Sequence, residues 1–293
     1  MTSLDAGTMI RGRYRLLHGT SAGGQTVRAF DRVRQQTVAV RLLGPTVDPA
    51  VRERIRADVA RAVTIVDPAL APLFSFDEQG DWALASRAWV DGDPLAGFLA
   101  RRGPLGPRAV RLLLGCLFDA LSALETAGLA HRQITTRNVI LVTDSVGTWS
   151  EAVLVDAGLS TSARSDAASE GDRAAAGLVI AQAIGLGERF DPRAARIQLP
   201  KAGALIQSLE RLIEGRPVPF HSLVEARADL LAAIDGWESG KAPPPPPIAA
   251  AVPYSQPVVV PTTVKIVDKP APPASAPDAP VEIAPPVADA EAM

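Results

Sequence analysis

Apolar and polar residues alternate in short runs through the first part of the chain, which is the pattern of half-buried β-strands. Four such runs, separated by turns rich in glycine and charge, fall at 14–17, 26–31, 37–43 and 82–90. The stretch 52–66 differs, because its apolar residues Ile55, Val59, Ala62 and Val63 return at helical spacing. A small β-rich unit with one helix is therefore expected here.

From Pro107 onward the apolar residues mostly repeat at helical spacing. The clearest helix begins at Pro107, and its apolar face carries Val110, Leu113, Leu114, Leu117, Leu121 and Leu124. Gly128 follows it at the place where a glycine often ends a helix. Further helices are expected at 172–184, 200–213 and 220–234, and strands at 139–142 and 152–155.

The order of these elements predicts an α+β fold with two lobes. After a lead-in at 1–9, a small β-rich lobe spans 10–90 and a larger helical lobe spans 91–238. The remainder, 239–293, has a different composition. The stretch 241–293 alone holds 15 of the 26 prolines, and they begin with five in a row at 243–247. Because proline lacks an amide donor and favours extended backbone, we expect a disordered tail.

Composition excludes several classes of function. A net charge of −2 at neutral pH gives no indication that the chain binds nucleic acid or an anionic membrane. The single cysteine, Cys116, rules out an internal disulfide framework and suits a reducing cytoplasm. It lies in an apolar helical run and is expected to be a core residue. No apolar run reaches the roughly 20 residues of a membrane helix, so the chain is expected to be soluble as given.

The most specific motif is His-Arg-Gln at 131–133, followed by Asn138 and an apolar strand. It resembles the catalytic loop of bacterial Hanks-type Ser/Thr protein kinases, which carries His-Arg-Asp. In that family the aspartate accepts the proton of the substrate hydroxyl. Gln133 stands in its place, and an amide can orient the hydroxyl but cannot accept its proton. The resemblance implies that His131 braces the loop and that Asn138 matches a metal ligand.

Landmarks of the small lobe resemble the same family. The segment 19–24 is similar to the phosphate-covering loop, with Ser21 for its middle glycine, although a plain Gly-rich turn explains it equally well. Val-Ala-Val-Arg at 38–41 resembles Val-Ala-Ile-Lys, whose lysine pairs with phosphate. In this chain the resemblance favours a structural ion pair of Arg41 over a phosphate contact, and residual nucleotide binding would use Ala39 and Arg41.

The counterpart of the family's helical glutamate, and so the expected partner of Arg41, is Asp58, with Glu53 as the alternative. Arg87 matches the usually apolar residue that guards the adenine pocket. A buried guanidinium there needs a carboxylate or a route to water. A shift of one residue in the alignment would instead place Arg87 on the surface.

Downstream, Asp-Ala-Gly at 156–158 resembles the metal-binding Asp-Phe-Gly, so Asp156 is a candidate Mg²⁺ ligand. The alternative is that Asp156 caps a turn or pairs with a cation such as Arg41. Asp172 matches the aspartate that anchors the catalytic loop. Only 13 residues separate Gly158 from Asp172, and they include no Ala-Pro-Glu anchor. That interval leaves too little chain for the activation loop and substrate shelf of active relatives.

These departures predict a pseudokinase, a domain that is not an enzyme and holds no required cofactor. Residual binding of ATP and Mg²⁺ would use Ala39, Arg41, Asn138 and Asp156, while Arg41, Asp58 and Gln133 are degenerate catalytic positions. Two alternatives stay open. One is an atypical active Ser/Thr kinase or residual ATP-binding protein, and the other is a structural domain, such as a homodimerisation unit.

The tail carries a separate candidate site. Thr263 is followed by Ile266, a spacing that suits phosphothreonine recognition by forkhead-associated domains, whereas Thr262 is followed by Lys265. A featureless linker is the alternative. The layout resembles the cytoplasmic pseudokinase domain of actinobacterial MviN/MurJ-type peptidoglycan-biosynthesis proteins. This resemblance implies an upstream Ser/Thr kinase, a forkhead-associated partner that regulates cell-wall synthesis, and a cytoplasmic domain held at the membrane only by flanking segments.

Overall fold

The computed structural model describes residues 5–17, 26–44, 46–79, 82–143, 149–161, 168–215 and 219–240. The chain divides into two units, Met1–Pro245 and Pro246–Met293, and every described residue belongs to the first. The predicted phosphate-covering loop at 19–24 and the tail residues Thr262, Thr263 and Ile266 lie outside the described residues.

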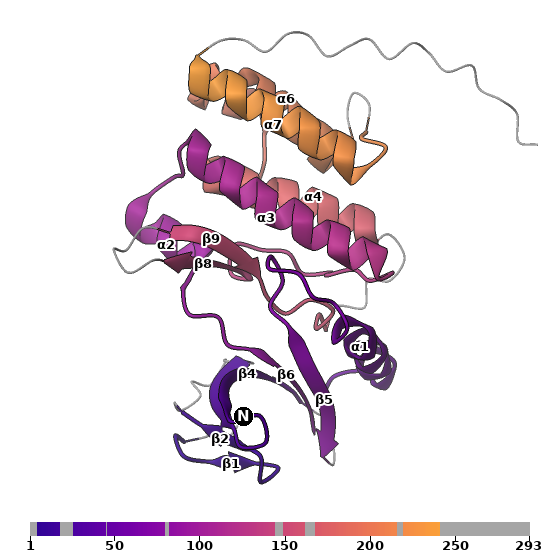
Figure 1. The fold of residues 1–293 in the computed structure, drawn as a ribbon. Helices are drawn as coiled ribbons and strands as arrows, with labels where there is room; N and C mark the ends of the chain where they lie inside the picture. The colour runs from indigo at the N-terminus through magenta and orange to yellow at the C-terminus, as the bar shows by residue number, and fades with distance from the viewer. Residues whose placement is uncertain are drawn as a thin grey trace, which may run out of the picture. The chain divides into compact units, whose positions relative to one another are not determined.

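A six-stranded antiparallel sheet forms the small lobe, in the order β1-β2-β3-β4-β6-β5 (Figure 1). Its strands are β1 (Met9–Ile10), β2 (Tyr14–Leu16), β3 (Thr26–Asp31), β4 (Gln36–Leu43), β5 (Leu73–Gln79) and β6 (Trp82–Ala88). Four of the six match the predicted runs. The pattern missed the two-residue β1 and also β5, which begins with Leu73 and Phe74 but continues into polar residues that disfavour strands.

Helix α1 (Pro49–Ala62) packs beside β5 (Figure 1). The carboxylate of Asp48 accepts hydrogen bonds from the first free amides of the helix, as an N-cap does. The predicted apolar face needs one correction, because the helix ends at Ala62 and leaves Val63 41% exposed. The buried face instead includes a charged residue, Asp58.

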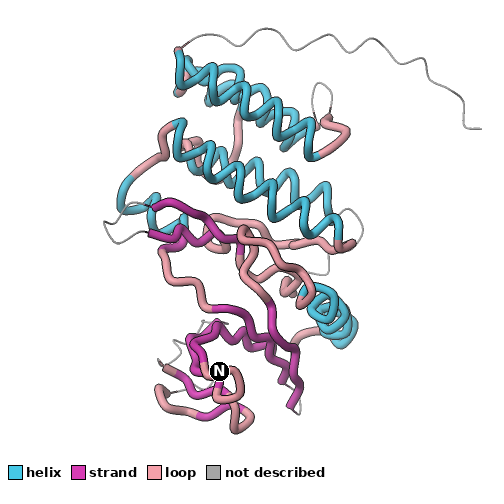
Figure 2. The backbone as a smooth tube through the Cα atoms, in the orientation of Figure 1, coloured by secondary structure: helices cyan, strands magenta, loops and turns pink. Residues whose placement is uncertain are grey.

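The large lobe contains a small sheet and a stack of helices (Figure 2). Its strands are β7 (Asp93–Pro94), β8 (Val139–Thr143) and β9 (Trp149–Leu154), in that order across the sheet. Its helices are α2 (Leu95–Arg102), α3 (Pro107–Thr126), α4 (Ala168–Ala183), α5 (Pro192–Gln198), α6 (Gly203–Glu214) and α7 (Leu223–Ser239), with a 3₁₀ turn at Pro200–Ala202.

Helix α3 is the core of this lobe and contacts β9, α4 and α7. Its predicted apolar face is confirmed, because all six residues of that face are buried. Gly128 follows the helix with φ +65°, a conformation that glycine adopts without strain. Cys116 is buried on the same helix, and burial raises the pKa of its thiol to about 12. The thiol is therefore a core group, as predicted.

The lobes are joined through the chain between α1 and β5. Leu70 and Leu154 form an isolated parallel bridge, in which Leu154 N–H donates to Ala69 O at 2.8 Å and Ala71 N–H donates to Leu154 O at 3.0 Å. These bonds fix the small lobe to the strand that leads into Asp156. Among the helices of the described residues, none combines the length and apolar character needed to cross a membrane.

Gly92, where the chain passes into the large lobe, should not tolerate a side chain. A Cβ atom there would lie 2.3 Å from the backbone oxygen of Leu141 on β8. We expect Gly92→Ala to lower the free energy of unfolding by about 1–3 kcal/mol, measured by urea denaturation. Gly115→Ala is the control, since nothing lies within 4 Å and alanine favours a helix. Equal effects of the two substitutions would contradict this account.

Candidate functional site

The loop between α3 and β8 is held by a carboxylate from another helix. Asp172 on α4 accepts the amide of His131 at 2.6 Å through Oδ2 and the amide of Arg132 at 2.7 Å through Oδ1. Arg132 has φ +64°, an uncommon conformation for a residue with a side chain. The two bonds to Asp172 fix the backbone that leads into this turn. Asp172 thus anchors the loop, as the kinase resemblance predicts.

His131 braces the loop from inside. Its side chain is fully buried, with Nε2 2.9 Å from Val155 O, while the amide of Gln133 lies 3.3 Å from Nδ1. Both contacts are satisfied by a neutral ring that is protonated at Nε2. Burial lowers the pKa of His131 to about 4, so the ring stays neutral near pH 7. The predicted bracing role is confirmed.

The carboxylate of Asp58 interacts with three arginine side chains. Its Oδ1 accepts from Arg61 Nη2 at 2.7 Å, its Oδ2 accepts from Arg132 Nη1, and Arg54 Nε lies 3.9 Å from Oδ2. The expected Arg41–Asp58 pair is therefore corrected: α1 directs Asp58 toward the loop after α3. This contact ties α1 to the catalytic-loop segment of the large lobe.

Arg41 and Arg87 instead bind the carboxylate of Asp156. Arg41 Nη1 donates to Oδ2 at 3.0 Å and Arg87 Nε donates to Oδ1 at 2.5 Å. The three residues are buried, with exposed fractions of 7%, 7% and 6%. We call them the Arg–Asp–Arg cluster. Arg87 is thus buried and has a carboxylate partner, so it is not on the surface. Asp156 pairs with Arg41, which was the alternative to its role as a Mg²⁺ ligand.

The cluster keeps Asp156 ionised. Burial alone would raise the pKa of Asp156, but the charges of Arg87 and Arg41 outweigh it and hold the pKa below the ordinary 3.8. Asp156 also adopts φ +65°, which aspartate tolerates better than most residues. Two guanidinium groups and one carboxylate leave the cluster with one positive charge.

Two polar side chains of the loop complete the site. Gln133 Oε1 lies 3.5 Å from Arg41 Nη2, so the position of the family's base is next to the cluster. Asn138 Nδ2 donates a hydrogen bond to Gln133 O at 2.7 Å, and this bond joins the two ends of the segment 133–138. Ala39 is fully buried in β4, where it is the register partner of Arg87. The structure therefore brings Ala39, Arg41, Gln133, Asn138 and Asp156 together.

The donor set suits a hard divalent cation. The Asp156 carboxylate and the Asn138 amide oxygen are the ligand types that Mg²⁺ prefers, and Arg41 supplies a charge for phosphate. In this structure, however, both oxygens of Asp156 accept from arginine. A metal at Asp156 therefore requires the cluster to open.

The sequence interpretation missed the arginines around Asp58. Arg54 and Arg61 lie four residues before and three residues after it, which are the spacings that place side chains together on one helix face. That spacing was available in the sequence. The contact of Arg132 with Asp58 was not, because 74 residues separate the two.

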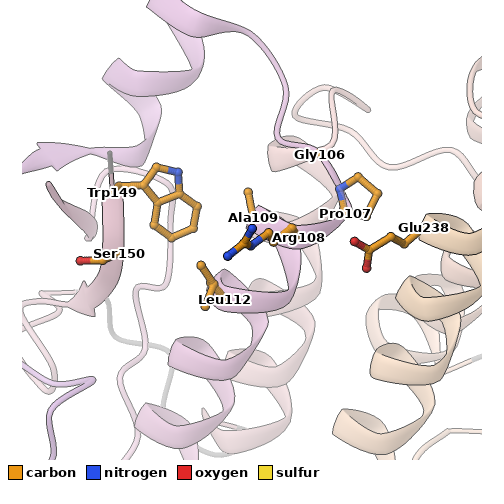
Figure 3. Close-up of a pocket in the computed structure, with 8 residues that line it drawn as sticks. All are labelled: Gly106, Pro107, Arg108, Ala109, Leu112, Trp149, Ser150 and Glu238. Carbon is orange, nitrogen blue, oxygen red and sulfur yellow. The ribbon is translucent and has the colours of Figure 1, made fainter. Parts of the chain in front are cut away.

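A cleft of about 680 Å³ lies in the large lobe, away from the cluster. Figure 3 shows the guanidinium of Arg108, at the start of α3, pointing toward the indole of Trp149 on β9. Leu112 and Glu238 also line it. It includes no residue of the Arg–Asp–Arg cluster or of the loop at 131–138.

Removing the anchor should destabilise the domain. Asp172→Ala leaves two buried amides without their acceptor, so we expect the free energy of unfolding to fall by about 2–4 kcal/mol in urea denaturation. Glu170→Ala, at an exposed position of the same helix, is the matched control. A loss no larger than that of the control would show that the anchor is not needed.

The Arg–Asp–Arg cluster should make stability depend on pH in acid. Because the folded pKa of Asp156 is below 3.8, its contribution is complete above about pH 4 and is lost as the pH falls through the folded value. The urea midpoint of the wild type should therefore fall more than that of Asp156→Asn between about pH 5 and about pH 3. Parallel curves for the two proteins would contradict this linkage.

Comparison with known proteins places the chain near bacterial kinases. No family model matches it. It is 30% identical over 151 residues to the Ser/Thr-protein kinase PknE of Mycobacterium tuberculosis. The aligned region covers 51% of this chain and 26% of PknE. The chain is 28% identical over 147 residues to PknH of the same species, which covers 50% of this chain and 23% of PknH. The match thus spans about a quarter of each relative.

The fold agrees with these relatives. The structure matches the crystal structure of a point mutant of the M. tuberculosis PknI kinase domain, with a TM-score of 0.68 at 21% identity, covering 78% of this chain and 98% of that one. The predicted two-lobed, kinase-like α+β fold is confirmed.

The prediction that the domain is not an enzyme is wrong. The relatives are named Ser/Thr-protein kinases and the fold is that of a kinase domain, which points to a kinase. The physical reason is that phosphoryl transfer depends mainly on positioning and electrostatics, so Gln133 removes a proton acceptor without removing the rest of the machinery. The chain therefore has a protein-kinase fold and is related to bacterial Ser/Thr protein kinases.

Proposed function

We propose that this domain is an atypical Ser/Thr kinase that binds Mg·ATP weakly and transfers its γ-phosphoryl group slowly. The observation that carries the proposal is the retained loop: Asp172 and His131 hold the segment that presents Gln133 and Asn138, beside the ionised Asp156. The loop is held by α4 and by the residue before Asp156, so it presents Gln133 and Asn138 in a fixed place.

Each side chain has a role in this proposal. When Mg²⁺ is bound, it neutralises charge on the phosphates, and Asp156 and Asn138 hold it. Arg41 pairs with the phosphate chain in place of the family's lysine. Ala39 lies in the buried strand that leads to Arg41.

In this proposal Gln133 limits the rate of phosphoryl transfer. Its amide oxygen can accept a hydrogen bond from the acceptor hydroxyl and so orient it, but it does not take the proton. The proton leaves the hydroxyl only as the new P–O bond forms, and it passes to solvent, which Gln133 reaches because it is exposed. Slow transfer is therefore expected.

Restoring a base should speed the reaction. We expect Gln133→Asp to raise transfer of the label from γ-³²P-labelled ATP by about 10²–10⁴-fold, the usual range for a positioned acid–base group. Because Gln133 is exposed, the change should not disturb folding. Gln133→Asn is the matched control, since it keeps an amide and should not raise the rate.

Two outcomes would count against a kinase. One is that the wild type, with Mg²⁺ or Mn²⁺ present, incorporates no more ³²P from labelled ATP than Asp156→Ala does. The other is the absence of any rise in melting temperature with Mg·ATP, because a ligand that binds only the folded state must raise it.

We also propose that phosphorylation of Thr263 recruits a partner, on the strength of the Thr-Val-Lys-Ile sequence at 263–266. A phosphate adds about −1.5 to −2 charges for an Arg-lined forkhead-associated pocket, and Ile266 supplies the aliphatic residue. In the setting implied by the MviN/MurJ resemblance, an upstream Ser/Thr kinase modifies the tail at the cytoplasmic face of the membrane and the partner regulates peptidoglycan synthesis.

The test of recruitment uses the full chain and a forkhead-associated domain. Binding should require phosphorylation and should be lost in Thr263→Ala but kept in Thr262→Ala, because Thr262 lacks the aliphatic residue three positions later. Binding that ignores phosphorylation, or that survives Thr263→Ala, would remove the proposal.

A further inference from the structure

Positive charge is concentrated in the small lobe of this chain. Residues 10–90 hold 12 arginines, no lysine and only eight acidic residues, whereas the chain as a whole has a net charge of −2. The net charge therefore conceals an uneven distribution. A local basic surface attracts anionic partners through its own field, whatever the charge of the rest of the chain.

Most of the arginines of this lobe have carboxylate partners, but three exposed ones do not. Arg13, for example, pairs with Asp31 at 2.7 Å. By contrast Arg15, on β2, and Arg32 and Arg34, in the turn between β3 and β4, are exposed. They form no ion pair with any residue that the structure describes. We call these three residues the hairpin arginines.

The hairpin arginines lie at one corner of the six-stranded sheet. Arg15 is the register partner of Phe30, near the end of β3, and its guanidinium carbon lies 5.8 Å from the centre of the Phe30 ring. The turn begins two residues later, and the amide of Arg32 donates to Arg13 O, next to β2, at 3.0 Å. Three uncompensated positive charges are therefore gathered on β2 and on the turn beside it.

The turn and its side chains are held in place. The carboxylate of Asp31 is buried, and its Oδ1 accepts the amides of Val33 at 2.9 Å and Arg34 at 3.2 Å. The guanidinium carbon of Arg34 lies 4.2 Å from the centre of the Phe74 ring. Stacking on a ring orders a long side chain without neutralising its charge, so less freedom is lost when that side chain binds an anion.

Val33 indicates which kind of anion fits. Its side chain, between Arg32 and Arg34 in the sequence, is 73% exposed. At the surface of an anionic bilayer, an apolar side chain enters the headgroup region while the neighbouring guanidinium groups bind lipid phosphates. Nucleic acid or an acidic protein segment would use the three cations but would gain little from an exposed valine.

We infer that the hairpin arginines and Val33 form a surface that binds anionic lipid headgroups. Each arginine close to an anionic membrane contributes about fivefold in affinity, so three of them bind weakly and reversibly. The surface orients the small lobe toward a bilayer and does not anchor the chain there. It is separate from the Arg–Asp–Arg cluster and does not depend on the proposed kinase activity.

Co-sedimentation of the full chain with vesicles at low ionic strength tests the inference. Binding to vesicles of phosphatidylcholine and phosphatidylserine in equal amounts should exceed binding to pure phosphatidylcholine, and added salt should weaken it. The triple variant Arg15→Gln/Arg32→Gln/Arg34→Gln should lose this binding. Equal binding to both kinds of vesicle, or undiminished binding by the folded triple variant, would overturn the inference.

The matched control is Arg102→Gln/Arg189→Gln/Arg193→Gln, which removes the same charge from exposed positions of the large lobe and should keep binding. An equal loss in both triple variants would show that net charge alone is responsible, and would overturn the inference.

Val33→Ser separates a lipid surface from other anions. It keeps all three cations but removes the apolar side chain, so it should weaken vesicle binding by a few fold. Unchanged binding by this variant would overturn lipid as the partner in favour of an acidic protein segment or nucleic acid.

Discussion

The contact of Asp156 with Arg41 and Arg87 is the interaction on which the rest of the site depends. It joins two strands of the small lobe to the segment that follows β9 in the large lobe. A buried ion pair contributes little net stability compared with apolar packing, but removing one partner leaves an uncompensated charge. Replacing one member of the cluster therefore changes the charge balance around the other two.

The loop at 131–138 has further contacts besides the one between Gln133 and this cluster. Asp172 accepts two backbone amides, His131 bonds to Val155 O, and Arg132 contacts Asp58 on α1. These contacts come from α4, from the residue before Asp156 and from α1, so three separate segments hold the loop.

The similarity to kinases changes how the substitutions at positions 41, 87 and 133 are interpreted. Gln133, Arg41 and Arg87 each depart from the usual residue, and together they suggested a domain without activity. The structure shows that two of them make one new contact, the pairing with Asp156. The substitutions at positions 41 and 87 therefore act together, through one buried carboxylate.

The sequence by itself determined the two-lobed fold, the face of α3 and the bracing roles of His131 and Asp172. The fold and the face of α3 follow from hydrophobic periodicity, which is a local property. The two bracing roles follow from the resemblance of both motifs to the kinase family, because 41 residues separate His131 from Asp172. Only the tertiary structure decided the charge pairing, and Asp58 was assigned to Arg41 when it belongs to Arg132. Partners that are 115 and 69 residues apart, as Asp156 is from Arg41 and Arg87, are chosen by how the lobes pack. Spacing along the chain carries no information about that choice.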